Sequence, residues 1–213
     1  LGKRNLMSIL FKQKSRRIIL GTLITIVAMA TLSSAQEAVK QNVNPTIKIG
    51  IRNFGRMDDR FYRGAQPNEK DYKALVALGI KTVIDLRDDP QSFERPLVES
   101  LGMKYVNIPM ADKKYPTPEV TQMFLKVVSD PASGKFFVHC AGGRHRTGAM
   151  GAVYRYEFYH WNFDQVYKEM KQYDFYTSWG HGAFKDFVEE YYARMQAGKG
   201  SNHSANSLAG QNK

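Results

Sequence analysis

Runs of β-branched and aromatic residues alternate with segments of helical periodicity through the middle of the chain, and this order constrains the fold most. Strands are predicted at residues 47–51, 61–64, 81–86, 104–110 and 135–139. Each of the last four precedes a predicted helix, and these helices cover residues 68–78, 92–101, 117–129 and 147–160. Repeated strand–helix–strand order predicts an α/β fold, with a mostly parallel central sheet flanked by helices.

Capping residues mark two of the helix starts clearly. Thr117 is a predicted cap, with Pro118 at the first helical position and an acidic residue after it. Asn162, with Gln165 three residues later, predicts a capping box at the start of another helix. A last helix is predicted over residues 183–195.

The two ends differ in composition from this body. Residues 1–35 hold six Lys or Arg and no acid, with the basic stretch 12–17 preceding fifteen mostly apolar residues, 18–32. Small residues up to Ala35 complete the layout of a cleaved secretory signal peptide, and an uncleaved membrane anchor is the alternative. The protein is therefore expected to be exported (periplasmic or secreted) or anchored in the cytoplasmic membrane. Residues 36–46 are interpreted as a linker, 47–195 as one domain, and 196–213 as a disordered tail.

Composition excludes several classes of protein and site. The net charge of +11 falls to +5 when residues 1–35 are set aside, so the body suits anionic ligands without indicating nucleic acid. The single cysteine excludes an internal disulfide framework and a zinc site made of several cysteines. His160, His181 and His203 show no cluster spacing, so no metal site is predicted.

One segment has a pattern with a clear chemical use. The strand 135–139 is followed by a loop and a helix start with the sequence Cys140-Ala141-Gly142-Gly143-Arg144-His145-Arg146-Thr147-Gly148. Backbone N–H groups of such a loop, together with the helix N-terminus, bind an anion and stabilise a thiolate at Cys140. The planar fork of Arg146 can hold two phosphoryl oxygens, and the Thr147 hydroxyl can donate to the sulfur.

This pattern resembles the His-Cys-x-x-Gly-x-x-Arg-Thr-Gly signature of the protein tyrosine phosphatase superfamily. The chain is similar to the small atypical dual-specificity phosphatases, including bacterial relatives that share Phe-Tyr-Arg-Gly-Ala-Gln-Pro (residues 61–67) and Val-Ile-Asp-Leu-Arg (83–87). The resemblance covers roughly residues 50–195. It implies a cysteine-phosphatase fold and a hydrolase of phosphate monoesters that forms a cysteinyl-phosphate intermediate. It also implies that no metal or organic cofactor is needed.

The resemblance implies a role for each residue of the loop. Cys140 is the expected nucleophile, Thr147 assists its departure, and His139 orients the loop and tunes the thiolate. The expected phosphate-binding residues are Ala141, Gly142, Gly143, Arg144, His145 and Arg146.

A general acid is expected on a loop upstream of the nucleophile. Asp112 fits because it follows the strand 104–110 and precedes Cys140 by 28 residues. Asp88 and Asp89 are the next candidates, whereas Asp85 and Asp130 are expected to be structural. Arg63 and Arg87 are expected to form structural salt bridges.

Several alternatives remain open at this stage. The Arg144-His145-Arg146 run resembles the Lys-His-Arg of atypical members that hydrolyse inositol pyrophosphates, so inositol polyphosphates or phosphoinositides are alternative substrates to phosphoproteins. A non-catalytic phosphate-binding module is a second alternative. A rhodanese-like sulfurtransferase is disfavoured by the spacing from Cys140 to Arg146. The expected partner is a phosphorylated protein or small molecule, with membrane contact only through an uncleaved N-terminal segment. The oligomeric state is not predicted.

Overall fold

A computed structural model describes residues 49–209, so the predicted signal segment and linker lie outside the described residues. Its five-stranded sheet has the order β1-β2-β5-β3-β4. The strands are β1 (Gly55–Arg56), β2 (Phe61–Ala65), β3 (Ile80–Arg87), β4 (Lys104–Met110) and β5 (Lys135–Cys140). β5 pairs in parallel with β2 and β3, β3 pairs in parallel with β4, and β1 is antiparallel to β2. The mostly parallel sheet predicted from the sequence is confirmed.

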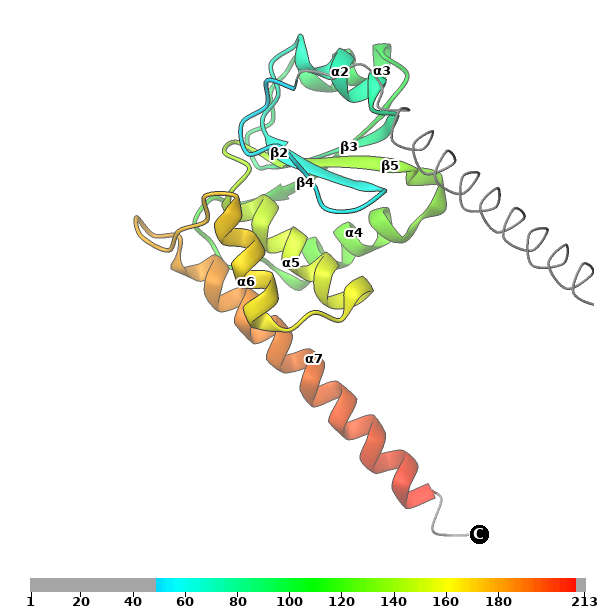
Figure 1. Cartoon of the computed structure of the whole chain (residues 1–213), viewed down its shortest axis with the longest axis vertical. Coiled ribbons are helices and arrows are strands. Elements are labelled where there is room, and N and C mark those ends of the chain that lie inside the picture. Colours follow the sequence, from blue (N-terminus) through cyan, green and yellow to red (C-terminus); the bar gives the residue numbers. More distant parts are fainter. Residues whose placement is uncertain (1–48, 210–213) are drawn as a thin grey trace, which may run out of the picture. The chain divides into compact units, whose positions relative to one another are not determined.

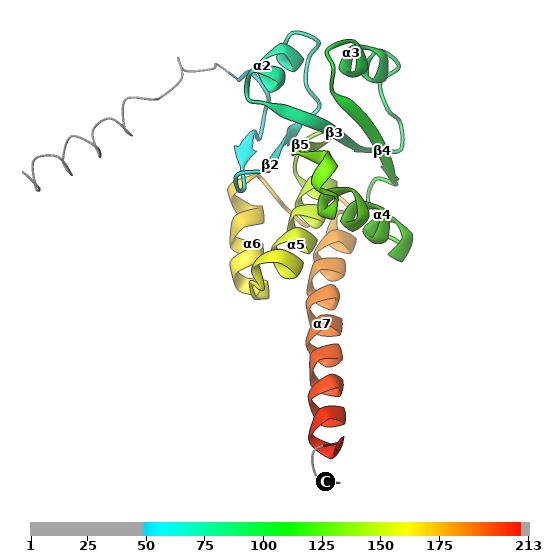
Figure 2. The ribbon, with the colours of Figure 1, turned by 90° about the vertical axis from the view of Figure 1, so that its right-hand side faces the viewer.

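Helices cover both faces of the sheet (Figure 1). One face carries α2 (Asp71–Ala77) and α3 (Glu94–Ser100). The other carries α4 (Pro118–Ser129), α5 (His145–Tyr159), α6 (Phe163–Gln172) and α7 (Gly182–Ala209), with a short 3₁₀ helix at Pro131–Ser133. The same two layers of helices are visible in the perpendicular view of Figure 2.

Strand β5 shows how the sheet separates two cores. Phe136, Val138 and Cys140 belong to the core on the side of α4–α7, whereas Phe137 belongs to the core under α2 and α3. Successive side chains of a strand point to opposite faces, and this alternation explains the division. It places the Cys140 side chain on the α5 side and sends His139 toward α3.

Helix α5 lies in the centre of the larger helical layer. It packs against α4, α6, α7 and β5, and its residues from His145 to Tyr156 are buried. A helix enclosed in this way needs apolar or small residues all round, which explains why its sequence lacks a clear polar face. The loop that follows Cys140 is therefore attached to a firmly packed helix.

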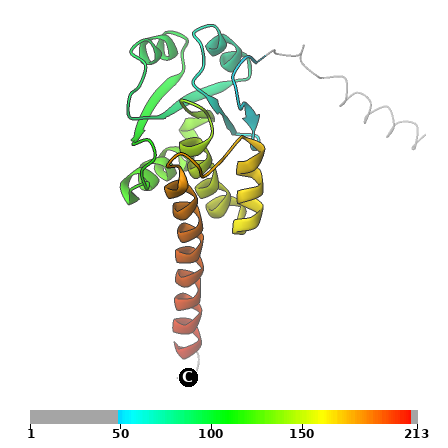
Figure 3. The ribbon, with the colours of Figure 1, turned by 90° about the vertical axis from the view of Figure 1, so that its left-hand side faces the viewer.

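The predicted helix starts at Thr117-Pro118 and Asn162 are confirmed, and Asn162 forms the full capping box with Gln165. Residues 49–51 form no strand, contrary to prediction. In the described backbone, α7 continues to Ala209, past the helices around it and into the segment 196–213 that the sequence predicts as a tail (Figure 3). Within the described range, none of the helices is both long and apolar enough to cross a membrane.

Candidate active site

The segment from Cys140 to Arg146 joins β5 to α5 at the carboxyl edge of the sheet. β5 lies between β2 and β3, so the loops after these strands flank the segment on both sides. Helix α5 begins at His145, and its free N–H groups therefore face the loop. A strand end, a tight loop and a helix N-terminus thus converge on the cysteine, as the sequence predicted.

Cys140 is the last residue of β5 and is 3% exposed. Burial alone would raise the pKa of its thiol. Interactions with the hydroxyl and backbone N–H of Thr147 and the charge of Arg146 outweigh burial, so the pKa lies below its ordinary value. The Thr147 hydroxyl is buried and finds no oxygen or nitrogen partner among the described residues, which leaves it available to the sulfur.

Arg146 is 5% exposed, and both hydrogen bonds that it makes to the described residues use one nitrogen, Nη1. Nη1 donates to Asp88 Oδ1 at 2.9 Å and to the Met110 carbonyl at 3.1 Å. Asp88, which the sequence left as a reserve acid, therefore anchors the arginine. The neighbouring Asp89 is paired with Arg87 at 2.8 Å, which is the salt bridge predicted for Arg87.

A cavity of about 180 Å³ lies over the loop. The predicted acid Asp112 borders it, so the structure brings Asp112 and Cys140 to one site. The other lining residues are Cys140, Ala141, Gly142, Arg144, His145, Arg146, Tyr176 and His181. Tyr176 and His181 belong to the segment between α6 and α7, and neither is predicted from the sequence to lie at this site. No local pattern marks them, because their place depends on how α6 and α7 pack.

Gly143 fastens the loop to strand β2. Its φ is +66°, and a Cβ atom there would lie 2.4 Å from the carbonyl carbon of Gly64. Arg63 Nη2 donates to the Gly143 carbonyl at 2.7 Å, and the Asn53 side chain donates to the Gly142 carbonyl at 2.8 Å. Only glycine allows both this backbone angle and this close approach.

Arg63 differs from its predicted role. It is 1% exposed, and burial lowers its pKa to about 10. The described residues give it no salt bridge; besides the loop carbonyl, it contacts the ring of Tyr173 at 4.0 Å from the ring centre. Arg63 therefore supports the loop through a hydrogen bond and a cation–π contact.

The loop residues Arg144 and His145 also differ from the basic rim suggested by the sequence. His145 is 7% exposed and lies parallel to His181, with ring centres 3.6 Å apart. Its Nε2 lies 3.0 Å from the Tyr176 carbonyl. Burial and the neighbouring His181 lower the pKa of His145 to about 4, so it is neutral at pH 7. Arg144 Nη2 lies 3.5 Å from Asp174 Oδ2. Because His145 is neutral and Arg144 is paired with a carboxylate, the rim of the cavity carries less positive charge than expected.

A buried polar network lies on the opposite side of β5. His139 Nε2 is 2.7 Å from Glu94 Oε1, and its Nδ1 is 3.8 Å from Asp85 Oδ1. Tyr72 donates to Glu94 and Tyr105 donates to Asp85, at 2.6 and 2.8 Å. In the described part of the chain, His139, Glu94 and Asp85 are the one convergent set of possible metal ligands.

Each carboxyl group of this network already accepts a tyrosine hydroxyl. Burial would raise the pKa of Glu94, but the contacts with His139 and Tyr72 outweigh burial and lower it. Burial raises the pKa of Asp85. The network therefore fixes His139 in the strand that ends in Cys140.

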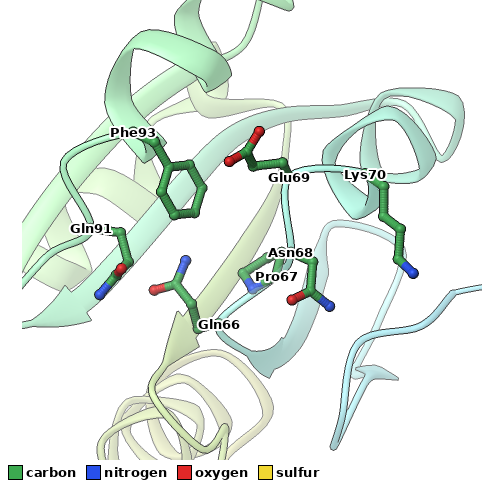
Figure 4. Close-up of a pocket in the computed structure, with 7 residues that line it drawn as sticks. All are labelled: Gln66, Pro67, Asn68, Glu69, Lys70, Gln91 and Phe93. Atoms are coloured by element: carbon green, nitrogen blue, oxygen red, sulfur yellow. The ribbon is translucent and has the colours of Figure 1, made fainter.

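A second cavity, of about 530 Å³, opens between the loops that follow β2 and β3 (Figure 4). Its lining residues are Gln66, Pro67, Asn68, Glu69, Lys70, Gln91 and Phe93. Gln66 links this cavity to the loop after Cys140, because its backbone N–H lies 3.5 Å from the Ala141 carbonyl. The Gln66 side-chain oxygen also accepts a hydrogen bond from Arg87 at 3.0 Å. The cavity thus adjoins the site without contributing one of the predicted catalytic residues.

Comparisons with known proteins agree with this geometry. The family described as "DSP-PTPase phosphatase fused to NAD+ Kinase" matches residues 38–186. A probable tyrosine-protein phosphatase of Dictyostelium discoideum, DG1060, is 29% identical over 126 residues, which cover 57% of this chain and 75% of the relative. The inositol diphosphatase DSP3 of Arabidopsis thaliana is 26% identical over 125 residues, covering 56% of this chain and 61% of that protein.

A solved structure is similar over most of the described region. The serine variant of P. aeruginosa TpbA, in complex with phosphotyrosine, is 25% identical, with a TM-score of 0.51. The alignment covers 72% of this chain and 87% of that one. Because the family match spans well over half of the sequence, the chain belongs to the DSP-PTPase phosphatase family.

Proposed function

We propose that this phosphatase hydrolyses phosphate monoesters with Cys140 as nucleophile, Arg146 as phosphate ligand and Asp112 as general acid. The single observation that supports this most is the cavity of about 180 Å³, which these three residues border together at the N-terminus of α5. A pure binding module would have no need of an activated thiol, yet the pKa of Cys140 lies below its ordinary value.

The reaction proceeds in two steps. The Cys140 thiolate attacks phosphorus, the bond from phosphorus to the substrate oxygen breaks, and Asp112 gives its proton to that oxygen. Asp112, now ionised, takes a proton from water as the water oxygen attacks phosphorus. The phosphorus–sulfur bond breaks, and the thiolate leaves with a hydrogen bond from Thr147.

The contacts of Arg146 suit this chemistry. Both of its hydrogen bonds in the described protein use Nη1. The opposite edge, made of Nε and Nη2, is left for two equatorial oxygens of the phosphoryl group, which is the bidentate arrangement that arginine favours. Asp88 and Met110 therefore hold the fork in the orientation that receives substrate.

We propose phosphotyrosine in proteins as the preferred substrate. A volume of 180 Å³ equals roughly six water molecules at about 30 Å³ each, and is smaller than a drug-sized pocket. This volume suits a phosphoryl group with the start of one side chain better than a fully enclosed polyphosphate. Tyr176 offers an aromatic wall, and the relative DG1060 and the TpbA complex point to the same class.

The test compares wild-type protein with Cys140→Ser. The variant should lose turnover of para-nitrophenyl phosphate and phosphotyrosine peptides by on the order of 10⁴-fold or more, because a serine hydroxyl is a far weaker nucleophile. It should still bind tungstate, since the loop amides and Arg146 remain. Turnover that persists in the variant without added metal would contradict the mechanism.

Inositol polyphosphates are the second candidate substrates, because Arg144 lies at the cavity and the relative DSP3 is an inositol diphosphatase. On this alternative, Arg144→Ala should lower kcat/KM for a polyphosphate about 10- to 100-fold, the value of one charge-assisted hydrogen bond, and affect para-nitrophenyl phosphate less. Asp174→Asn is the matched control: it releases Arg144 from its partner and should raise activity on the polyphosphate. Equal losses on both substrates would return the assignment to phosphotyrosine.

We also propose that residues 1–35 direct the phosphatase out of the cytoplasm. Support comes from the basic stretch 12–17, the apolar run 18–32 and the small residues that end at Ala35. Retention of this segment as a membrane anchor is the alternative.

A further inference from the structure

The loop that carries Asp112 lacks regular secondary structure. It joins β4 to α4, and Asp112 is exposed within a turn at its start. The described residues supply no hydrogen bond to its carboxyl group, although a general acid must hold one oxygen against the leaving group. The orientation of Asp112 therefore has to come from what the loop rests on.

Two residues, Lys113 and Tyr115, hold this loop against the segment between α6 and α7 and against α7 itself. Lys113, with φ +58°, lies over Gly180, where an added Cβ would be 3.4 Å from the Lys113 side chain. Tyr115 packs edge-on against Phe187 of α7, with ring centres 5.4 Å apart, and donates to Glu190 at 2.7 Å. Asp112 lies in the chain between the end of β4 and these two residues, and it borders the cavity.

His181 follows Gly180 directly and borders the same cavity as Asp112. It is 7% exposed, stacks on His145 at 3.6 Å, and meets the edge of the Tyr176 ring at 5.2 Å. Its buried Nδ1 has no hydrogen-bond partner among the described residues. A ring held this rigidly, with an unused polar atom, needs a reason beyond packing.

The charges around His181 favour a neutral ring. Burial lowers the pKa of His181, Lys113 and Arg146 lower it further, and the negative charge of Asp112 acts in the opposite direction. The stacked His145 is neutral at pH 7. A neutral imidazole can donate an N–H without adding a positive charge that would favour the ionised carboxylate.

We propose that His181 is a positioning residue for the general acid, donating an N–H to one oxygen of the Asp112 carboxyl group so that the other oxygen carries the proton to the leaving group. This inference rests on the proposed role of Asp112. The segment between α6 and α7 would then act on catalysis through the acid, in addition to forming a wall of the cavity.

Leaving-group dependence separates this role from a structural one. His181→Leu still places a side chain against His145, but this side chain is apolar and has no N–H group. It should lower kcat/KM for phenyl phosphate about tenfold, a part of the 10²–10⁴ that a general acid supplies, and change kcat/KM for dinitrophenyl phosphate little. Thermal unfolding should confirm that the variant is folded. His181→Asn, which retains an N–H donor, should recover part of the loss.

His160→Asn is the matched control for the asparagine variant. His160 is exposed at the end of α5, where its φ of +54° suits asparagine. Its activity should match that of the wild-type protein on both substrates.

A double-mutant cycle gives the decisive result. In protein that already carries Asp112→Asn, His181→Leu should cause no further loss, because the group it positions is no longer an acid. Additive losses, or equal losses on good and poor leaving groups, would overturn the inference while leaving the proposed function intact. Failure of Asp112→Asn itself to discriminate between leaving groups would instead overturn the assignment of the acid.

Discussion

In the proposed mechanism, Arg146 interacts with two anions, the Asp88 carboxylate and the phosphoryl group of the substrate. Its Nη1 donates to Asp88 and to the Met110 carbonyl, and Arg146 also lines the cavity over the loop 140–146. Asp88 fixes the orientation of the guanidinium, but its negative charge also opposes an incoming phosphate dianion. Geometry and charge therefore have opposite effects at this position, and they can be separated by substitution.

Asp88→Asn should strengthen the binding of oxyanions. The amide oxygen still accepts from Nη1, while the opposing charge is removed. Because the Asp88 side chain is 44% exposed, the gain should be that of a solvent-screened pair, about 0.2–1 kcal/mol or up to about fivefold in the Ki of tungstate. Competitive inhibition against para-nitrophenyl phosphate measures it. Weaker tungstate binding would show that the ionised carboxylate is needed to hold the arginine.

At the scale of elements, the segment between α6 and α7 is built around the stack of His145 and His181. Phe175 and Phe184 pack against His145, with ring centres 5.3 and 6.1 Å away. Two imidazolium rings at 3.6 Å would repel each other, so the stack opposes the protonation of both rings at once. Packing and protonation are thus linked in this element.

This linkage predicts that the protein loses stability in mild acid. The pKa of His145 falls from 6.5 to about 4 on folding, so the unfolded chain binds the extra proton between these values. The free energy of unfolding should therefore fall as the pH is lowered from about 6.5 to about 4, by up to about 3 kcal/mol for this group. Urea unfolding at a series of pH values measures the slope. His145→Phe should flatten it, and an unchanged slope would assign it to other groups.

At the scale of the whole molecule, much of the fold could be predicted because its signals are local. The buried strand β5, the cap at Thr117-Pro118 and the box at Asn162 are each visible within a few residues, and the cysteine loop is recognisable by spacing alone. Residues 61–67 and 83–87 carry a recognisable family pattern. That pattern does not reveal that Gln66 contacts the loop after Cys140.

The remaining features depend on contacts between distant segments. The pairing of Arg146 with Asp88 joins residues 58 positions apart, and the stack of His145 on His181 requires the packing of α6 and α7. No periodicity or spacing encodes either contact. The neutral state of His145 follows from burial, which a sequence pattern cannot give for an isolated loop residue.

The proposed export of the chain concerns the whole molecule, and it is directly testable. Residues 1–48, fused to a reporter enzyme that requires disulfide bonds, should give activity in a bacterial host, because such a reporter matures outside the cytoplasm. Ile26→Lys, which interrupts the apolar run, should abolish the reporter activity, whereas Gln41→Lys in the predicted linker should leave it unchanged. N-terminal sequencing should find a start near Gln36, and material that retains residues 18–32 would favour the anchored form.

The contact between Gly143 and Gly64 has a consequence for the evolution of the chain. A Cβ at residue 143 would overlap the backbone of Gly64, and a Cβ at residue 64 would lie 2.7 Å from Ile51. Neither glycine can be replaced on its own without a clash. A new side chain at residue 143 meets backbone, and one at residue 64 meets a packed neighbour. Substitution of either glycine is therefore disfavoured among descendants of this sequence. Substrate preference can diverge at Arg144 or Tyr176 while this pair of glycines stays fixed.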